Sequence, residues 1–140
     1  MKGFVVVIAG LITCCGCSSA DPFAYVQVSG KVTYEDGSPI PADSIRLTFV
    51  PQSKSLDEKT HARPGVAEVS VADGSFSVVT SRKHGDGIVP GPHKVTVVAL
   101  DATQTPTDAV SGEYAAEATT PLEVDTSNQP FHLLIRKPVP

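Results

Sequence analysis

The chain has 140 residues with 15 acidic and 11 basic side chains, a net charge of −4 that suits one domain with a hydrophobic core. The basic residues form no stripe or run, which argues against nucleic acid as a partner because neutralising phosphates requires clustered Lys and Arg. All three cysteines lie within residues 14–17, so the rest of the chain has no disulfide framework.

Residues 2–17 have the order of a secretory signal peptide. Lys2 precedes the uncharged run Phe4–Ile12, and the segment ends at a cysteine behind Gly16. A membrane-spanning helix needs roughly 20 apolar residues, and this run is less than half as long. It therefore predicts a signal peptide rather than a lasting transmembrane helix. The ending Gly16-Cys17 resembles a bacterial lipobox, in which the thiol takes a diacylglyceryl group and becomes the first mature residue.

We predict Cys17 as the lipidated residue, carrying palmitate-type acyl chains, because a small residue directly precedes it. Cys14 and Cys15 remain alternatives, and Cys14 occupies the place where a lipobox usually has Leu. A signal peptide without lipid, cut after Ala20, is the other alternative. The predicted organisation is a signal at residues 1–16, a short tether at 17–24 and a folded domain at 25–140.

Apolar residues that alternate with polar ones predict short strands along the domain, beginning at Tyr25. The predicted strands number seven and cover residues 25–34, 45–49, 68–71, 75–78, 93–100, 122–125 and 131–136. With frequent Gly and Pro between them, they predict an all-β fold, a seven-stranded antiparallel β-sandwich. The predicted core is Val28, Val32, Ile45, Leu47, Phe49, Val69, Val71, Phe76, Val78, Val95, Val97, Leu133 and Ile135.

The dipeptide Asp73-Gly74 predicts a hairpin with a two-residue type I′ loop. This register pairs Val71 with Phe76 and Val69 with Val78, so that apolar residues meet on one face.

Other connections are predicted to be open. Asp36-Gly37 predicts a turn followed by an extended connection over Ser38–Ser44, because the prolines there cannot donate to a strand ladder. Pro51–Pro64 is polar and predicts a solvated loop. Asp101–Thr120 is the longest irregular segment, with room for one helical turn, and such segments are often functional or mobile.

Several motifs, taken in order, resemble those of carboxypeptidase regulatory-like domains. They are Val28–Thr33, Asp36–Ile40, Leu47–Pro51, Ala72–Phe76 and Gly87–Val97. A lipobox directly before such a domain is similar to small bacterial lipoproteins called transthyretin-like. The resemblance covers residues 26–137 and implies a transthyretin-like or immunoglobulin-like sandwich that serves as an accessory or adhesion module.

The resemblance implies no peptidase activity, because no His-x-x-Glu zinc pair occurs in the chain. Hydroxyisourate hydrolases, which share the wider fold, end in Tyr-Arg-Gly-Ser, whereas this chain ends in Ile135–Pro140. We therefore predict a protein that is not an enzyme and holds no cofactor.

Arg82–Gly87 is the densest polar cluster, and it makes His84 and Asp86 the candidate binding residues. They would act as metal ligands or as a base and its orienting group, and the alternative is an exposed loop whose glycines form turns. No histidines are paired at metal-ligand spacing, so no metal is predicted.

The predicted function is that of a lipid-anchored protein of the cell envelope, on the outer or cytoplasmic membrane, facing the periplasm or the surface. The domain would bind a protein or a glycan without catalysis. The alternatives are a structural subunit of an envelope assembly and a hydrolase on a transthyretin-like scaffold. We expect the contact surface on membrane-distal loops, either Asp101–Thr120 or Arg82–Gly87, because a sandwich holds its loops in place.

Overall fold

The computed structural model describes residues 21–140, whose regular secondary structure is almost entirely β-strand. The helical element of this part is a single 3-10 turn, η1, at Gly112–Ala115. The strands are β1 (Gly30–Tyr34), β2 (Ser44–Pro51), β3 (Gly65–Glu68), β4 (Ser75–Phe76), β5 (Val79–Thr80), β6 (Pro92–Leu100), β7 (Glu123–Asp125) and β8 (Phe131–Ile135).

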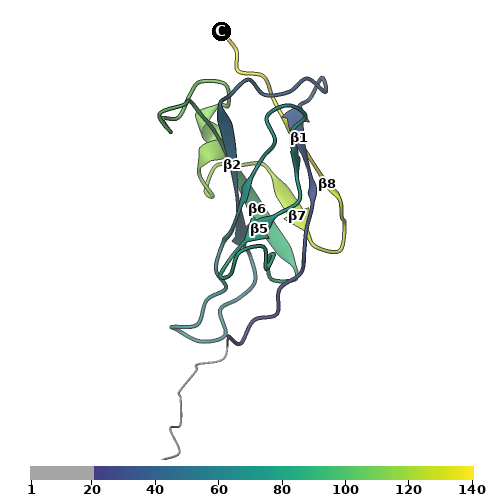
Figure 1. The fold of residues 1–140 in the computed structure, drawn as a ribbon. Helices are drawn as coiled ribbons and strands as arrows, with labels where there is room; N and C mark the ends of the chain where they lie inside the picture. The colour runs from purple at the N-terminus through teal and green to yellow at the C-terminus, as the bar shows by residue number, and fades with distance from the viewer. Residues whose placement is uncertain (1–20) are drawn as a thin grey trace, which may run out of the picture.

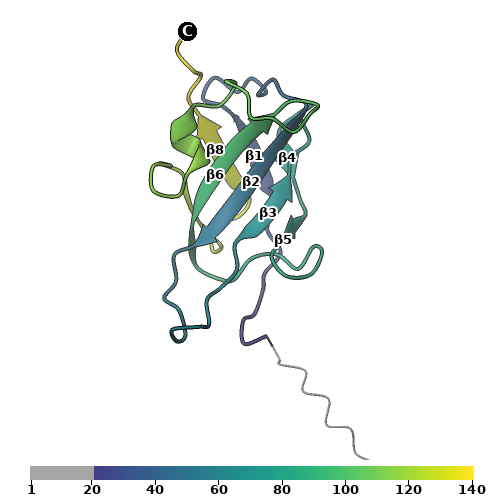
Figure 2. The ribbon, with the colours of Figure 1, turned by 90° about the vertical axis from the view of Figure 1, so that its left-hand side faces the viewer.

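The strands form two sheets (Figure 1). The larger sheet has the order β5-β3-β2-β6-β7, and the smaller has the order β4-β1-β8. Figure 2 shows the larger sheet in front and the smaller sheet behind it. The described residues hold eight strands rather than the seven expected, because the predicted strand at 75–78 is replaced by two short strands in different sheets.

Side chains from the two sheets meet in one hydrophobic core. The ring of Phe49 in β2 lies 5.7 Å from that of Phe76 in β4 and 5.9 Å from that of Phe131 in β8, measured between centroids. This layering is consistent with the expected β-sandwich. The predicted core residues that are buried are Val28, Val32, Ile45, Leu47, Phe49, Val69, Phe76, Val95, Val97, Leu133 and Ile135.

The expectation of antiparallel pairing throughout was wrong for the first and last strands. β8 runs parallel to β1, with Gly30 opposite Phe131 and Tyr34 opposite Ile135. The other strand pairs are antiparallel. Alternating polarity carries no information on strand direction, because Leu133 is buried in either orientation. The direction follows from the path of the chain, which leaves β7 in the larger sheet and crosses to the smaller one before β8.

The predicted hairpin at Asp73-Gly74 was wrong in loop length and in partner. The Ser70 N–H donates to the Ser75 carbonyl at 2.8 Å, and the Gly74 N–H donates to the Ser70 carbonyl at 2.7 Å, which makes a longer loop. The Asp73 carboxylate accepts from the N–H and the hydroxyl of Ser75 and so stabilises this wider turn. Beyond the turn, β4 pairs with β1 in the smaller sheet, while β3 pairs with β5.

The crossing between sheets also explains two errors in the predicted core. Val71 and Val78 are exposed, at 36% and 46%, whereas Val79 is 0% exposed. Val71 lies in the turn rather than in a strand. After Phe76 the chain leaves the smaller sheet and enters the larger one as β5, which shifts the inward-facing position by one residue.

The connections after β1 and β2 were predicted correctly. The Tyr34 N–H donates to the Ser38 carbonyl at 3.0 Å and closes the turn at Asp36-Gly37. β2 begins only at Ser44, in the other sheet. Residues 52–64 form no strand and are mostly exposed, as expected for a solvated loop.

The segment 101–120 is irregular and contains one helical turn, as expected, but it is packed against the core. Tyr114 of η1 is 2% exposed, and its hydroxyl accepts from the Arg136 N–H at 3.1 Å. The Thr120 hydroxyl donates to the Val95 carbonyl at 2.6 Å. β7 pairs only with the start of β6, so the segment protects the remaining edge of that strand.

Candidate functional site

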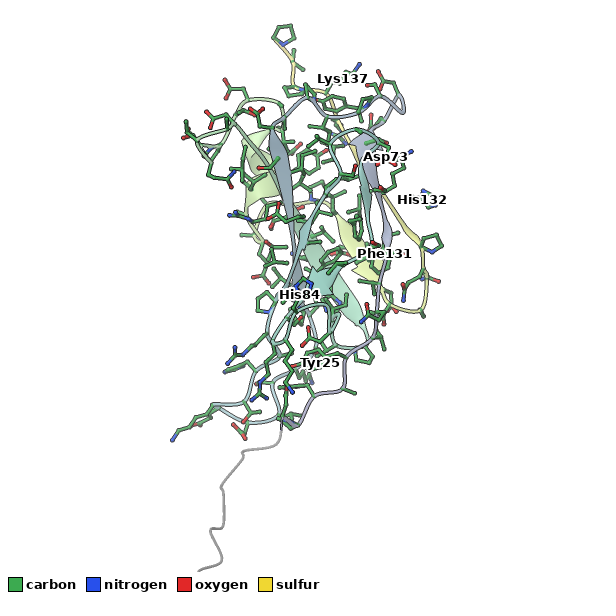
Figure 3. All side chains as sticks on the ribbon, in the orientation of Figure 1. Tyr25, Asp73, His84, Phe131, His132 and Lys137 are labelled. Carbon is green, nitrogen blue, oxygen red and sulfur yellow. The ribbon has the colours of Figure 1, made fainter. Side chains whose placement is uncertain are left out.

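A polar cleft with converging cations lies where the described chain begins. We call this the N-terminal end of the domain, formed by Asp21–Tyr25 and the loops 52–64 and 81–87 (Figure 1). The cleft has a volume of about 560 Å³. Its lining consists of Asp21, Pro22, Phe23, Tyr25, Lys59, Thr60, His61, Arg63 and Arg82. Figure 3 shows Tyr25 at this end of the molecule and Lys137 at the opposite end.

Strand pairing brings the two loops together. Loop 52–64 directly precedes β3, and loop 81–87 directly follows β5. β3 and β5 are antiparallel, with Val66 opposite Thr80, so the two loops emerge at the same end of the sheet. The sequence prediction missed this cleft because it assigned residues 17–24 to a tether, whereas Asp21, Pro22 and Phe23 line the cleft.

Asp21 fastens the start of the domain to loop 81–87. Its carboxylate accepts a 2.5 Å hydrogen bond from the Tyr25 hydroxyl and forms an ion pair with the Arg82 guanidinium at 3.1 Å. The hydrogen bond from Tyr25 is the main cause that lowers the pKa of Asp21. Burial, together with the neighbouring Asp21 carboxylate, raises the pKa of Tyr25 to about 12. Residues predicted as part of a tether are therefore in contact with the domain.

Loop 81–87 is built around the carboxylate of Asp86. One oxygen accepts from the Ser81 N–H at 2.8 Å, and the other accepts from the N–H groups of Arg82 and Lys83 at 3.1 and 2.8 Å. Burial opposes ionisation of Asp86, but these backbone donors outweigh it and lower the pKa of the carboxyl. Gly87 has a φ of +93°, which lets the chain turn from the loop back towards β6.

Loop 52–64 is folded around Asp57 in a similar way. The Asp57 carboxylate accepts from the N–H groups of Lys59 and Thr60 at 2.7 and 2.8 Å, and from the Thr60 hydroxyl at 2.9 Å. These donors lower the pKa of Asp57, with the Lys59 N–H as the main cause. The turn points the side chains of Lys59, His61 and Arg63 outward, where they are exposed.

Fewer of the cations are paired at this end than elsewhere in residues 21–140, where Lys31 and Lys94 are the ones without an ion pair. Arg46, Arg136 and Lys137 each pair with a carboxylate. The lysines and arginines of the two loops, except Arg82, make no ion pair with any described residue; these are Lys54, Lys59, Arg63 and Lys83. An arrangement of unpaired cations beside a cleft is suited to binding an anion.

The structure places the two sequence-predicted binding residues in different surroundings. The Asp86 carboxylate accepts hydrogen bonds from backbone N–H groups of its own loop. His84 is exposed and lies beside a second cleft of about 490 Å³, together with Val66, Glu68, Val78 and Thr80. No hydrogen bond in the described part of the chain joins His84 to Asp86. Their role in binding stays a prediction.

The predicted placement of the two candidate binding loops needs one correction. Arg82 pairs with Asp21 at the start of the described chain, so loop 81–87 lies near the tether and not at the far end. The tip of the segment 101–120 lies towards the opposite end (Figure 1). Cys17, the predicted lipidation site, lies outside the described residues.

The remaining histidines do not form a ligand set. Within residues 21–140, no group of three or more His, Cys, Asp or Glu side chains could hold a metal ion. His93 is buried; its Nδ1 lies 3.0 Å from the Gly91 carbonyl, and its Nε2 has no hydrogen-bond partner. Burial lowers the pKa of His93, which favours the neutral ring. His132 projects outward from the smaller sheet (Figure 3).

No helix in the described part of the chain is long and apolar enough to cross a membrane. No family model, curated protein or solved structure matches the chain.

Proposed function

We propose that the chain is a lipid-anchored protein of the cell envelope, whose folded part is a non-catalytic module that binds a protein or a glycan. The observation that carries the proposal is the order of residues 2–17, in which a cation and a short apolar run end at Gly16-Cys17. The run is too short to hold the protein in a bilayer by itself, so a lipid on the thiol would supply the anchor.

We propose that the folded domain is a transthyretin-like β-sandwich of the carboxypeptidase regulatory-like kind. Its support is that the resembling motifs fall on strands and turns of the two sheets. Val28–Thr33 leads into β1, Leu47–Pro51 lies in β2, and Gly87–Val97 leads into β6. The proposed family rests on these residues and on the layering of the sheets.

A binding role is supported by the hydrogen bonding of the carboxylates and the exposure of the cations at the N-terminal end. The carboxylates of Asp21, Asp57 and Asp86 are occupied by hydrogen bonds that hold loops in place. A general base needs a carboxylate that can reach a substrate proton, and these are engaged elsewhere. The exposed cations and the outer loop surfaces remain for contacts with another molecule.

Acyl labelling of the expressed protein tests the anchor. Cys17→Ser should abolish palmitate incorporation and leave the precursor unprocessed, while Cys14→Ser and Cys15→Ser should label normally. Two or three acyl chains, at about 0.8 kcal/mol per buried methylene, would anchor the protein stably, whereas one chain is marginal. Normal labelling of the Cys17→Ser protein would move the anchor to another cysteine, and absence of labelling in the unsubstituted protein would refute lipidation.

Photo-crosslinking in intact cells tests the binding role. A photoreactive residue in place of Ala102, at the tip of the segment 101–120, or of His84, beside the second cleft, should yield discrete adducts identifiable by mass spectrometry. Both positions are exposed, so neither substitution should disturb folding. Absence of adducts at both positions would contradict a binding module.

A further inference from the structure

The charge of the domain is divided unevenly between its ends. The N-terminal end holds five basic residues (Lys54, Lys59, Arg63, Arg82 and Lys83) and four acidic ones (Asp21, Asp57, Glu58 and Asp86), a balance of +1. The rest of residues 17–140 holds five basic and eleven acidic residues, a balance of −6. A mildly acidic protein thus presents one end that is not acidic.

Three of the four acidic groups at this end are engaged by hydrogen bonds or an ion pair, and the fourth, Glu58, is exposed. Asp57 and Asp86 accept from backbone N–H groups of their own loops, and Asp21 pairs with Arg82 and Tyr25. The side chains of Lys59 and Arg63 are exposed and lie at the rim of the same cleft as His61. Lys59 and Arg63 are therefore exposed at this end without an ion pair to any described residue.

The tether keeps this end close to the proposed anchor. Cys17 and Asp21 are separated by four peptide steps, which span at most about 14 Å when fully extended. Asp21 is fastened to Tyr25 and Arg82, so the domain cannot move away on the full length of residues 17–24. At physiological ionic strength charges are screened over about 8 Å, a distance comparable with this reach.

We propose that the N-terminal end is a headgroup-binding surface that docks on anionic phospholipids of the anchoring membrane. The proposal rests on the lipid anchor proposed above. Lys59 and Arg63 contact phosphate oxygens, with the cleft beside Tyr25 accepting a headgroup, and Lys54 and Lys83 add to the attraction. Docking fixes the orientation of the domain, so that the tip of the segment 101–120 faces away from the membrane.

Fluorescence quenching on vesicles tests the surface with the mature, lipidated protein. If Cys17 carries lipid, an introduced cysteine is the only free thiol, because Cys14 and Cys15 leave with the signal. A fluorophore is attached at Ser55→Cys in loop 52–64 or at Ala102→Cys at the far end, both exposed. The vesicles contain phosphatidylcholine alone or with phosphatidylglycerol, and a trace of lipid with a quencher on its headgroup.

We expect quenching at position 55 to rise severalfold when phosphatidylglycerol is added and to fall back at high salt. Quenching at position 102 should stay low in both vesicles. The double variant Lys59→Glu/Arg63→Glu should lose the rise, whereas Lys31→Glu/Arg136→Glu, with the same change in net charge away from this end, should keep it. Thermal unfolding of each variant checks that the fold is intact.

The outcomes separate this proposal from the anchor. Protein that fails to float with either vesicle refutes the anchor and, with it, the docking surface. Protein that floats with both vesicles but shows equal quenching at position 55 overturns the docking surface and leaves the anchor standing. Equal loss in both double variants would also overturn it, because the attraction would then follow net charge and not this end.

Discussion

The loops at the N-terminal end and the segment 101–120 are both irregular, yet different interactions hold them in place. Asp57 and Asp86 hold their loops from within, through hydrogen bonds to nearby backbone N–H groups. The segment 101–120 is held from outside, by burial of Tyr114 and by hydrogen bonds to β6 and to the residue after β8. Length alone therefore does not distinguish a loop held by its own hydrogen bonds from one that completes the core.

The largest effect should come from removing the side chain that holds the segment 101–120. Tyr114→Ala should lower the free energy of unfolding by about 3–5 kcal/mol, as for other large aromatic side chains removed from a core. Tyr114→Phe should cost only about 1 kcal/mol, the value of the hydrogen bond to the Arg136 N–H. Chemical denaturation measures both. A loss below about 1 kcal/mol for Tyr114→Ala would show that the segment is a surface loop.

A second test compares two adjacent valines, Val78 and Val79, to find which of them belongs to the core. Val79→Ala should cost about 1.5–3 kcal/mol, because Val79 is fully buried in β5. Val78→Ala, one residue earlier and exposed, should change stability by less than about 0.5 kcal/mol. The reverse order of effects would restore the hairpin register that the sequence predicted.

Acid should weaken the packed part of the molecule through His93. Burial lowers the pKa of this ring in the folded state below its ordinary value of 6.5. The unfolded chain then binds more protons, so the free energy of unfolding falls as the pH drops below about 6.5 and until the lowered pKa is reached. His93→Leu should flatten this pH dependence, measured by denaturation at a series of pH values. An unchanged slope in that variant would assign the acid sensitivity to other groups.

The smallest effect on stability should come from the exposed cations of the N-terminal end. Lys59→Glu and Arg63→Glu should each change the free energy of unfolding by less than about 0.5 kcal/mol, because neither residue forms an ion pair in the described structure. Thermal unfolding checks this. A larger loss would mean that these side chains support the fold, and would remove the contrast with the segment 101–120.

Much of the fold could be predicted from alternation, because residues such as Ile45, Leu47 and Phe49 face one core in any arrangement of the strands. Alternation failed where the chain changes sheets between Phe76 and Val79, since the crossing interrupts the period without changing the composition. Strand direction and partner depend on contacts that are distant in sequence, which local pattern does not contain. The cleft at the N-terminal end was missed because Asp21, Pro22 and Phe23 were assigned to a tether, although the polar loops beside them were each expected.

The parallel pairing of β1 with β8 has a consequence for how the domain can form. Gly30 and Phe131 are partners across nearly the whole length of the domain, so the smaller sheet needs both its first and its last strand. A chain that emerges gradually, from a ribosome or through a membrane pore, cannot complete this sheet until its last strand is free. Such long-range pairing folds slowly, commonly in milliseconds to seconds, because loop closure comes before its contacts. The smaller sheet should therefore stay incomplete until β8 has emerged.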